Sequence, residues 1–189
     1  MESFQTALES VNRYTEKYTS FAPVYDQILR ELPSDPVIVE IGIANGGSLE
    51  MWRGIFGDGA RIIGVDLNPN CVSLEDEGYE VLIADMGSSA GFERLRALTP
   101  DGIDLLVDDG GHTNEQQIAA LRYGFPLIRD GGYLVIEDIH SAFMRDFANP
   151  SRWSSWSYLS RLIADVHRLH PRSQTPAQLP AISTDIESV

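Results

Sequence analysis

Five chemically active side chains gather at the ends of two short apolar segments. The first segment ends in Asp108 and Asp109, and the second ends in Glu137 and Asp138. His112 follows Asp109 by three positions. Carboxylates held side by side repel one another unless a cation or shared protons compensate, and a divalent ion with oxygen ligands is the simplest compensation. The pattern therefore indicates a metal-binding site.

Two strands joined by a helical connection would bring these acids together. The apolar runs cover residues 103–107 and 133–136, and the chain between them has a helical pattern. A strand, a crossover helix and a second strand form a right-handed unit, in which the strands are parallel and their carboxyl ends share one sheet edge. We therefore expect all four carboxylates at one edge of a parallel sheet.

A glycine-rich turn follows the first expected strand, residues 37–41. The turn reads GIANGG at 42–47 and precedes a helix for which Ser48 is the expected N-cap. Glycines permit positive φ and let a ligand lie against bare backbone, while a helix N-terminus offers free N–H groups. The spacing differs from the G-x-G-x-x-G of dinucleotide enzymes, and Glu40 would repel a phosphate. The expected ligand carries positive charge or hydroxyl groups.

An acid stands at the end of every expected strand. Asp66 ends the second strand, residues 61–65, about 20 residues beyond the glycine turn, where a ribose diol is gripped in nucleotide-binding sheets. Asp85 ends the third strand, residues 79–84, before a helix expected at 92–98. An isolated acid here is usually a cap or turn former, but five at one edge indicate a ligand site. These five are Glu40, Asp66, Asp85, Asp109 and Asp138.

These motifs together resemble a known family. The Glu40-Ile-Gly42 segment with Gly46, followed by Asp66 and Asp85, resembles the cofactor signature of class I S-adenosylmethionine-dependent methyltransferases. With VDDGGH at 107–112 and VIEDIH at 135–140, the chain is more specifically similar to the Mg-dependent sugar O-methyltransferases of macrolide antibiotics, of mycinamicin and tylosin type, and to relatives called cephalosporin hydroxylases. The similarity spans roughly residues 15–143 and includes the segment YTEK at 14–17, with Tyr25 beyond it, which is similar to a T-D-K segment of those enzymes.

The resemblance implies S-adenosyl-L-methionine as cofactor. Gly42 and its neighbours would approach the methionine half, Asp66 would hold the ribose hydroxyls, and Asp85 with Met86 would border the adenine. The residues expected to bind the cofactor are Glu40, Gly42, Asn45, Gly46, Ser48, Asp66, Asp85, Met86 and Asp108.

The resemblance also implies Mg²⁺ and a sugar or glycoside acceptor. Asp109, Glu137 and Asp138 would ligate the ion, which could take two neighbouring sugar oxygens in its remaining octahedral positions and lower the pKa of the attacking hydroxyl. His112 would be the general base, because an imidazole with a pKa of about 6.5 is largely neutral at cytoplasmic pH. Asp109 and His112 are therefore the expected catalytic residues.

Other roles remain open for single residues. His112 could instead cap the helix that begins near Thr113, and Asp108 could serve only the loop backbone. His140 could line the acceptor site or be a plain loop histidine. Two more histidines are expected on a helix surface, His167 and His170.

Three other functions remain in competition. Mg²⁺ would chelate a catechol or other aromatic diol as well as a sugar diol, so a methyltransferase of aromatic diols is one alternative. A non-catalytic subunit would keep the cofactor pocket and bind the cofactor with or without metal. Oxygen activation by iron fits less well, because one histidine and three carboxylates differ from the two-histidine, one-carboxylate set of such sites.

Length and composition predict one globular domain. The chain has 189 residues, 43% of them hydrophobic, which suits a single core. A formal charge of −14 argues against nucleic acid as a partner, since such proteins neutralise phosphates with basic patches. The lone Cys71 excludes an internal disulfide, and no signal peptide or apolar run of about 20 residues is present. A cytoplasmic protein without membrane contact is expected.

The expected fold is a doubly wound, mostly parallel α/β sheet of Rossmann-like class I methyltransferase type. It would occupy residues 37–189, after an N-terminal helical extension at 1–36. The extension, with helices over about 3–18 and 21–32, could be scaffold, cover a sheet edge, roof the site or contact a partner subunit.

The C-terminal part is less regular. A loop is expected at 141–152 and a helix at 153–169, whose aromatic residues could stack on a sugar, pack in the core or form a subunit interface. With the family resemblance, they suggest a homodimer or higher homo-oligomer. Only residues 181–189 could form the sixth strand of this fold, and no segment remains for its usual antiparallel seventh.

Overall fold

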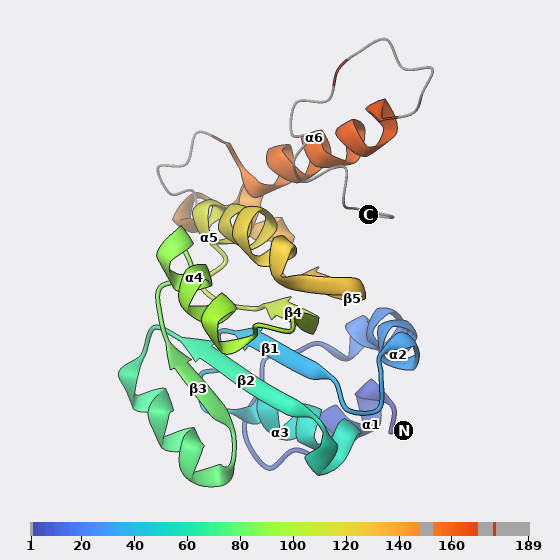
Figure 1. The fold of residues 1–189 in the computed structure, drawn as a ribbon, viewed down its shortest axis with the longest axis vertical. Helices are drawn as coiled ribbons and strands as arrows, with labels where there is room; N and C mark the ends of the chain where they lie inside the picture. Colours follow the sequence, from blue (N-terminus) through green and yellow to red (C-terminus); the bar gives the residue numbers. More distant parts are fainter. Residues whose placement is uncertain (1, 148–152, 170–175, 177–189) are drawn as a thin grey trace.

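A parallel β-sheet forms the centre of the molecule (Figure 1). The computed structural model describes residues 2–147, 153–169 and 176. The sheet has five strands in the order β3-β2-β1-β4-β5. The chain moves outward from β1 to β3 and then returns to the other side of β1 with β4, which makes the β1–β4 junction a topological switch point. The strands are β1 (Val37–Ile41), β2 (Arg61–Asp66), β3 (Glu80–Ile83), β4 (Ile103–Asp108) and β5 (Ile128–Ile136).

Helices cover both faces of the sheet, as the doubly wound prediction required (Figure 1). Helices α1, α2 and α3 lie on one face and α4 and α5 on the other, while α6 packs on α5 and extends away from the sheet. The α-helices are α1 (Phe4–Ser10), α2 (Ala22–Glu31), α3 (Gly47–Phe56), α4 (Ser89–Leu98), α5 (Asn114–Ala119) and α6 (Ser155–Arg168). Short turns of 3₁₀-helix occur at Thr19–Phe21, Gly57–Gly59, Pro69–Glu77, Phe125–Leu127, Ile139–Phe143 and Arg145–Phe147, and a π-helical turn at Ala120–Gly124.

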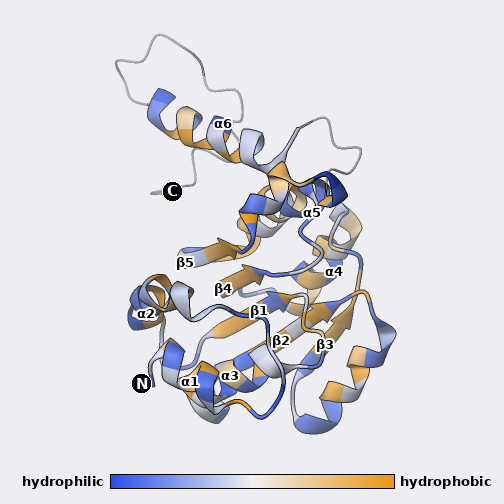
Figure 2. Ribbon diagram, turned by 180° about the vertical axis from the view of Figure 1, so that it is seen from behind, coloured by the Kyte–Doolittle hydropathy of each residue, from blue (hydrophilic) through white to orange (hydrophobic). Residues whose placement is uncertain are grey.

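Alternation along each central strand divides the core into two layers. In β4, Leu105 and Val107 pack toward α3, whereas Leu106 packs toward α4 and α5, and all three are fully buried. Continuous apolar runs are typical of parallel strands with both faces covered. Figure 2 shows these hydrophobic strands between helices of mixed character.

The first two helices belong to the same core. Phe4 of α1 and Tyr25 of α2 stack with ring centroids 4.5 Å apart, and both rings lie against Trp52 of α3. Helix α1 ends at Ser10, earlier than predicted, and residues 11–18 form a segment without helix or strand that we call the strap.

The prediction that Ser48 caps α3 was wrong. The N-cap is Gly46, whose φ of 83° lies in the left-handed region, and the helix begins at Gly47. Gly46 closes the glycine turn with its backbone alone, so no side-chain oxygen is needed there. Ser48 is instead buried in the first turn of the helix.

Other boundaries differ by a few residues from expectation. Helix α4 and strand β5 begin earlier than predicted, and the loop expected after Asp138 contains 3₁₀ turns up to Phe147. His167 is exposed on α6, as predicted. The possible sixth strand at 181–189 and His170 lie outside the described residues. Within the described part, no helix combines the length and the apolar character that crossing a bilayer requires.

Two glycines of α3 should respond oppositely to alanine. A Cβ on Gly54 would have room, because its nearest neighbour outside the helix backbone is the Glu2 carboxylate at 4.0 Å. Gly54→Ala is therefore expected to raise the free energy of unfolding by about 0.5–1 kcal/mol. A Cβ on Gly47 would collide with the carbonyl oxygen of Tyr14 in the strap, so Gly47→Ala should lower the free energy of unfolding. Urea denaturation of both variants measures this, and equal stabilisation would contradict the close contact between strap and helix.

Candidate functional site

A cavity of about 680 Å³ opens at the carboxyl ends of the strands around the switch point. Its walls come from the glycine turn, the ends of β2 and β5, the loop between β4 and α5, and the strap. This size and position are typical of small-molecule sites in open α/β sheets. The predicted site residues that line it are Gly42, Asn45, Ser48, Asp66, Met86, Asp109, His112, Glu137 and Asp138.

Four residues predicted to bind the cofactor do not line this cavity. Glu40 is fully buried, and Gly46 caps α3. Asp85 is exposed and accepts a hydrogen bond from its own turn. Asp108 is buried at the end of β4, and burial raises its pKa to about 6. Their roles toward a cofactor stay predictions.

Asp66 shapes the glycine turn. Its Oδ2 accepts hydrogen bonds from the backbone N–H groups of Ile43, at 3.0 Å, and Ala44, at 3.1 Å. Gly42 has a φ of 86°, and a Cβ there would collide with the backbone of Asp109. Glycine at this position therefore lets the β1 turn approach the loop that carries the candidate metal ligand.

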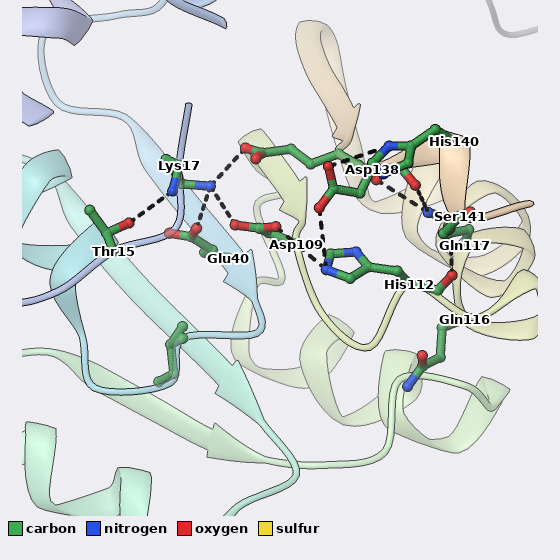
Figure 3. Close-up of polar contacts among 12 residues, drawn as sticks. Thr15, Lys17, Glu40, Asp109, His112, Gln116, Gln117, Asp138, His140 and Ser141 are labelled. Carbon is green, nitrogen blue, oxygen red and sulfur yellow. Dashed lines mark hydrogen bonds and ion pairs between the residues drawn. The ribbon is translucent and has the colours of Figure 1, made fainter. Parts of the chain in front are cut away.

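Asp109, His112 and Asp138 form a compact acid–histidine cluster (Figure 3). One potential ligand atom from each lies within 4.8 Å of the others. His112 Nε2 is 3.6 Å from Asp138 Oδ2 and 4.0 Å from Asp109 Oδ1. His140 Nδ1 lies 3.7 Å from Asp138 Oδ1, but its side chain is 66% exposed. The structure thus brings two predicted metal ligands together with the predicted base.

Backbone strain is concentrated at this cavity. Among the described residues, three that are not glycine have positive φ: Ala44 at 44°, His112 at 54° and Asp138 at 53°. Left-handed backbone costs an L-residue roughly 1–2 kcal/mol, although Asp, Asn and His adopt it more often than other residues. Such strain persists where the surrounding structure enforces it and is common at functional sites.

Helix α5 fixes the loop that carries His112. Thr113 is the N-cap and forms a reciprocal capping box with Gln116, so His112 does not cap the helix. The carbonyl of His112 accepts a hydrogen bond of 2.8 Å from the Ser141 hydroxyl. The backbone that carries the imidazole is therefore fixed by the capping box of α5 and by the Ser141 hydroxyl.

The strap inserts Lys17 among the strand-end acids (Figure 3). Its Nζ lies 2.7 Å from Glu137 Oε1, 2.8 Å from Glu40 Oε1 and 2.9 Å from Asp109 Oδ2. The Tyr25 hydroxyl donates a short hydrogen bond to the same Glu137 oxygen. Glu137 is thus directed toward Lys17 and stands outside the acid–histidine cluster.

Glu40 is held from a second side. Trp52 Nε1 donates a hydrogen bond of 2.7 Å to Glu40 Oε2, while Lys17 contacts Oε1. Oε2 is therefore hydrogen-bonded, whereas Oε1 has the Lys17 ammonium as an ion-pair partner but no hydrogen bond. A buried charge is tolerated when it is paired in this way.

The acids outnumber the cations at this edge. Burial alone would lower the pKa of Lys17, but the neighbouring carboxylates, Glu40 foremost, hold it well above its usual value, so the ammonium is charged. Burial raises the pKa of Asp109 to about 7, although Lys17 opposes the shift. Burial lowers the pKa of His112 against the pull of Asp138, which favours neutral imidazole. One ammonium thus faces several carboxylates, an imbalance that a divalent ion would reduce.

Sequence reasoning missed most of the strap. Tyr14, Glu16 and Tyr18 line the cavity although no role was predicted for them, and Lys17 was noted only within a motif. The available signal was the similarity of that motif to a segment of known enzymes. Periodicity could not reveal it, because the strap has no regular secondary structure.

The aromatic residues of α6 lie away from the cavity. Tyr158 packs with Leu162 against Ile118 and Leu121 of α5. Trp156 is half-exposed beside Phe143, with ring centroids 5.9 Å apart. No described residue of α6 lines the cavity.

Fold and site together define a ligand-binding α/β domain whose cavity joins a glycine turn to an acid–histidine cluster. The family model described as a methyltransferase domain matches residues 39–139, and the chain belongs to that family. This agrees with the resemblance in the motifs.

Two relatives to which the chain is similar in sequence are O-methyltransferases. The chain is 34% identical over 160 residues to 8-demethyl-8-(2-methoxy-alpha-L-rhamnosyl)-tetracenomycin-C 3'-O-methyltransferase of Streptomyces olivaceus, a match covering 78% of this chain and 40% of the relative. It is 33% identical over 155 residues to demethylmacrocin O-methyltransferase of Streptomyces fradiae, covering 76% and 38%. The chain therefore spans about two fifths of the length of these relatives.

The fold also has solved counterparts. The MycE methyltransferase of the mycinamycin biosynthetic pathway, in complex with Mg and SAH, aligns with a TM-score of 0.71 at 24% identity. The alignment covers 87% of this chain and 47% of MycE. The Rossmann-like methyltransferase fold predicted for the chain is thereby confirmed.

Proposed function

We propose that the chain is an S-adenosylmethionine- and Mg-dependent O-methyltransferase that acts on a sugar hydroxyl of a glycoside. The observation that carries this proposal is one cavity that joins the glycine turn to Asp109, His112 and Asp138. The names of the relatives, which include several sugar O-methyltransferases, favour a glycoside over a catechol as acceptor.

Mg²⁺ would be held by Asp109, Asp138 and Glu137. The site fits such an ion, because its acids supply the oxygen ligands that Mg²⁺ prefers and its charges are unbalanced. When bound, the ion would orient two neighbouring hydroxyl oxygens and lower the pKa of the one that attacks. His112 is a poor ligand for so hard an ion and is left as a base.

His112 would take the proton of the acceptor hydroxyl. Its burial favours the neutral imidazole, and Nε2 faces the acids where the acceptor would be oriented. When bound, S-adenosylmethionine would supply the methyl group to the acceptor oxygen as its own methyl–sulfur bond breaks. The products are the methyl ether, S-adenosylhomocysteine and a protonated His112. The glycine turn would hold the cofactor in line with the oxygen, and positioning of this kind supplies much of the acceleration.

Calorimetric titration with S-adenosylhomocysteine and then with Mg²⁺ tests the binding part of the proposal. Turnover of labelled S-adenosylmethionine with rhamnosides and with catechols tests the acceptor. Methylation of glycosides would support the proposal. Methylation of catechols alone would refute the proposed sugar acceptor and assign an aromatic diol in its place. Cofactor binding without a metal site would refute the mechanism, and no cofactor binding would refute the function.

Mg²⁺ affinity should weaken as the pH falls below about 7. A metal-bound carboxylate is deprotonated, whereas Asp109, whose pKa burial raises to about 7, holds a proton below that pH. Proton and ion therefore compete, and the apparent Kd is expected to rise by up to about tenfold per pH unit on the acid side and to level off above it. Titrations from about pH 6 to about pH 8 measure this, and constant affinity would exclude Asp109 as a ligand with this pKa.

A further inference from the structure

Lys17 is the only lysine of the chain, and its side chain is completely buried. A lysine ammonium has three hydrogen-bond donors. Here it donates hydrogen bonds to Asp109 and Glu137 and forms an ion pair with Glu40, and all three carboxylate oxygens lie within 2.9 Å of Nζ. Burial of a lysine is costly unless its charge is paired, and here three carboxylates neutralise it.

These partners come from three adjacent strands. Glu40 lies in β1, Asp109 follows β4 and Glu137 follows β5, and these strands are neighbours in the sheet. Lys17 therefore ties together the strand ends that carry the candidate metal site. The contact also sets orientation, because Asp109 uses Oδ2 for Lys17 while Oδ1 faces His112.

The strap depends on side chains at both ends for its position. At its start, Asn12 Nδ2 donates to Glu50 at 2.7 Å, and Arg13 binds the Asn45 carbonyl at 2.9 Å and Glu77 at 2.5 Å. At its other end, Lys17 is the anchor.

The middle of the strap is a wall of the cavity. Tyr14, Thr15 and Glu16 line it between the two anchors. The backbone of Tyr14 also lies against Gly47 in the first turn of α3. Movement of Lys17 would therefore alter the acid edge and the cavity wall together.

We propose that Lys17 is a positioning residue that closes the strap over the cofactor cavity and fixes the carboxylates of Asp109 and Glu137 for a divalent ion. Cofactor and metal binding are then coupled through one ammonium, and each ligand tightens the other by the same factor. The identity of both ligands rests on the proposed function, whereas the coupling is additional to it.

Chemical labelling of the single lysine tests closure on the unaltered chain. The rate of reaction with an amine-specific acylating reagent is followed by mass spectrometry of the peptide that contains Lys17. We expect saturating S-adenosylhomocysteine and Mg²⁺ together to slow labelling by about tenfold or more relative to the free chain. Equal rates with and without the ligands would contradict closure.

Two variants separate the strap from the acid edge. The double variant Lys17→Met, Glu40→Gln removes one positive and one negative charge, so the net charge of the acid edge is unchanged, and Glu137 keeps the Tyr25 hydroxyl as a hydrogen-bond partner. The matched control, Arg13→Met, removes the contacts of Arg13 with Asn45 and Glu77 at the start of the strap and leaves the three carboxylates around Lys17 unchanged. Calorimetry should show S-adenosylhomocysteine affinity falling by about tenfold in both, and Mg²⁺ affinity falling by about tenfold only in the double variant. Wild-type Mg²⁺ affinity in the double variant would overturn the proposal.

A milder change covers the possibility that the double variant does not fold. Tyr25→Phe removes the second donor to Glu137 and keeps the ring that stacks on Phe4. It should weaken Mg²⁺ binding while leaving labelling of Lys17 slow in the presence of both ligands. The positioning role of Lys17 would be refuted if this variant bound Mg²⁺ as tightly as the wild type and if the ligands did not slow labelling of Lys17 in the wild type.

The proposed function can fail separately from this inference. If the wild-type chain binds neither ligand, both proposals fall. If it binds both, but labelling and the Mg²⁺ affinity of the variants do not change, only the role of Lys17 is refuted.

Discussion

Replacing Asp109 with asparagine is expected to abolish Mg²⁺ binding and to lower kcat by on the order of 10³-fold or more, because an ion acting as template and Lewis acid contributes several kcal/mol. Asparagine has the same shape, so the variant removes charge while leaving a carbonyl oxygen near Lys17 and His112. In the absence of Mg²⁺, S-adenosylhomocysteine should bind to the variant nearly as it binds to the wild type, since the glycine turn is untouched. Calorimetry and turnover of labelled cofactor measure both effects.

The matched control is Asp130→Asn. Asp130 is exposed near the amino end of β5, whereas the candidate site lies at the carboxyl end of that strand. The same chemical change there should leave Mg²⁺ affinity unaltered. An Asp109→Asn variant that bound Mg²⁺ as tightly as this control would remove Asp109 from the proposed ligand set.

Replacing His112 with asparagine is expected to lower kcat by about 10²–10⁴-fold, which is the usual contribution of a positioned general base. Asparagine is preferred to alanine because His112 has a φ of 54°, a conformation that asparagine tolerates. The loop should therefore keep its shape, and binding of S-adenosylhomocysteine and Mg²⁺ should persist. Loss of both ligands together would indicate a structural role instead.

The pH dependence gives His112 a second test. Burial lowers its pKa, so the imidazole stays neutral to a lower pH than an exposed histidine and accepts protons there. At saturating Mg²⁺, wild-type kcat should fall only as the pH drops through this lowered pKa, and that limb should vanish in the asparagine variant. A retained limb would assign the titration to another group.

The strands and their common edge could be predicted from the sequence because their signals are local. Largely apolar runs of five residues at 37–41, 61–65 and 103–107 marked β1, β2 and β4, and the crossover rule placed their ends together. The pattern could not decide which acids face the cavity. Glu40 and Asp108 lie within strands and point into the buried layers, whereas Asp109 and Asp138 follow the strands and line the cavity.

The role of Lys17 was beyond sequence reasoning for a different reason. Its partners Asp109 and Glu137 lie 92 and 120 residues away in the chain, and no periodic pattern links an irregular segment to them. Charge imbalance predicted that a cation was needed at this edge. It could not predict that one cation would come from the chain itself.

The order of the two acids after β5 carries information of its own. Glu137 needs the longer side chain, because its carboxylate reaches Lys17 and Tyr25. Asp138 has a φ of 53°, where a short acid that can bond to its own backbone is favoured over a long one. Exchanging the two residues would keep the same composition and charge. Aspartate at position 137 would then be too short to contact Lys17 and Tyr25, and glutamate would occupy position 138, where the backbone is left-handed. A motif search that treats the two acids as interchangeable therefore discards a signal that the backbone itself imposes.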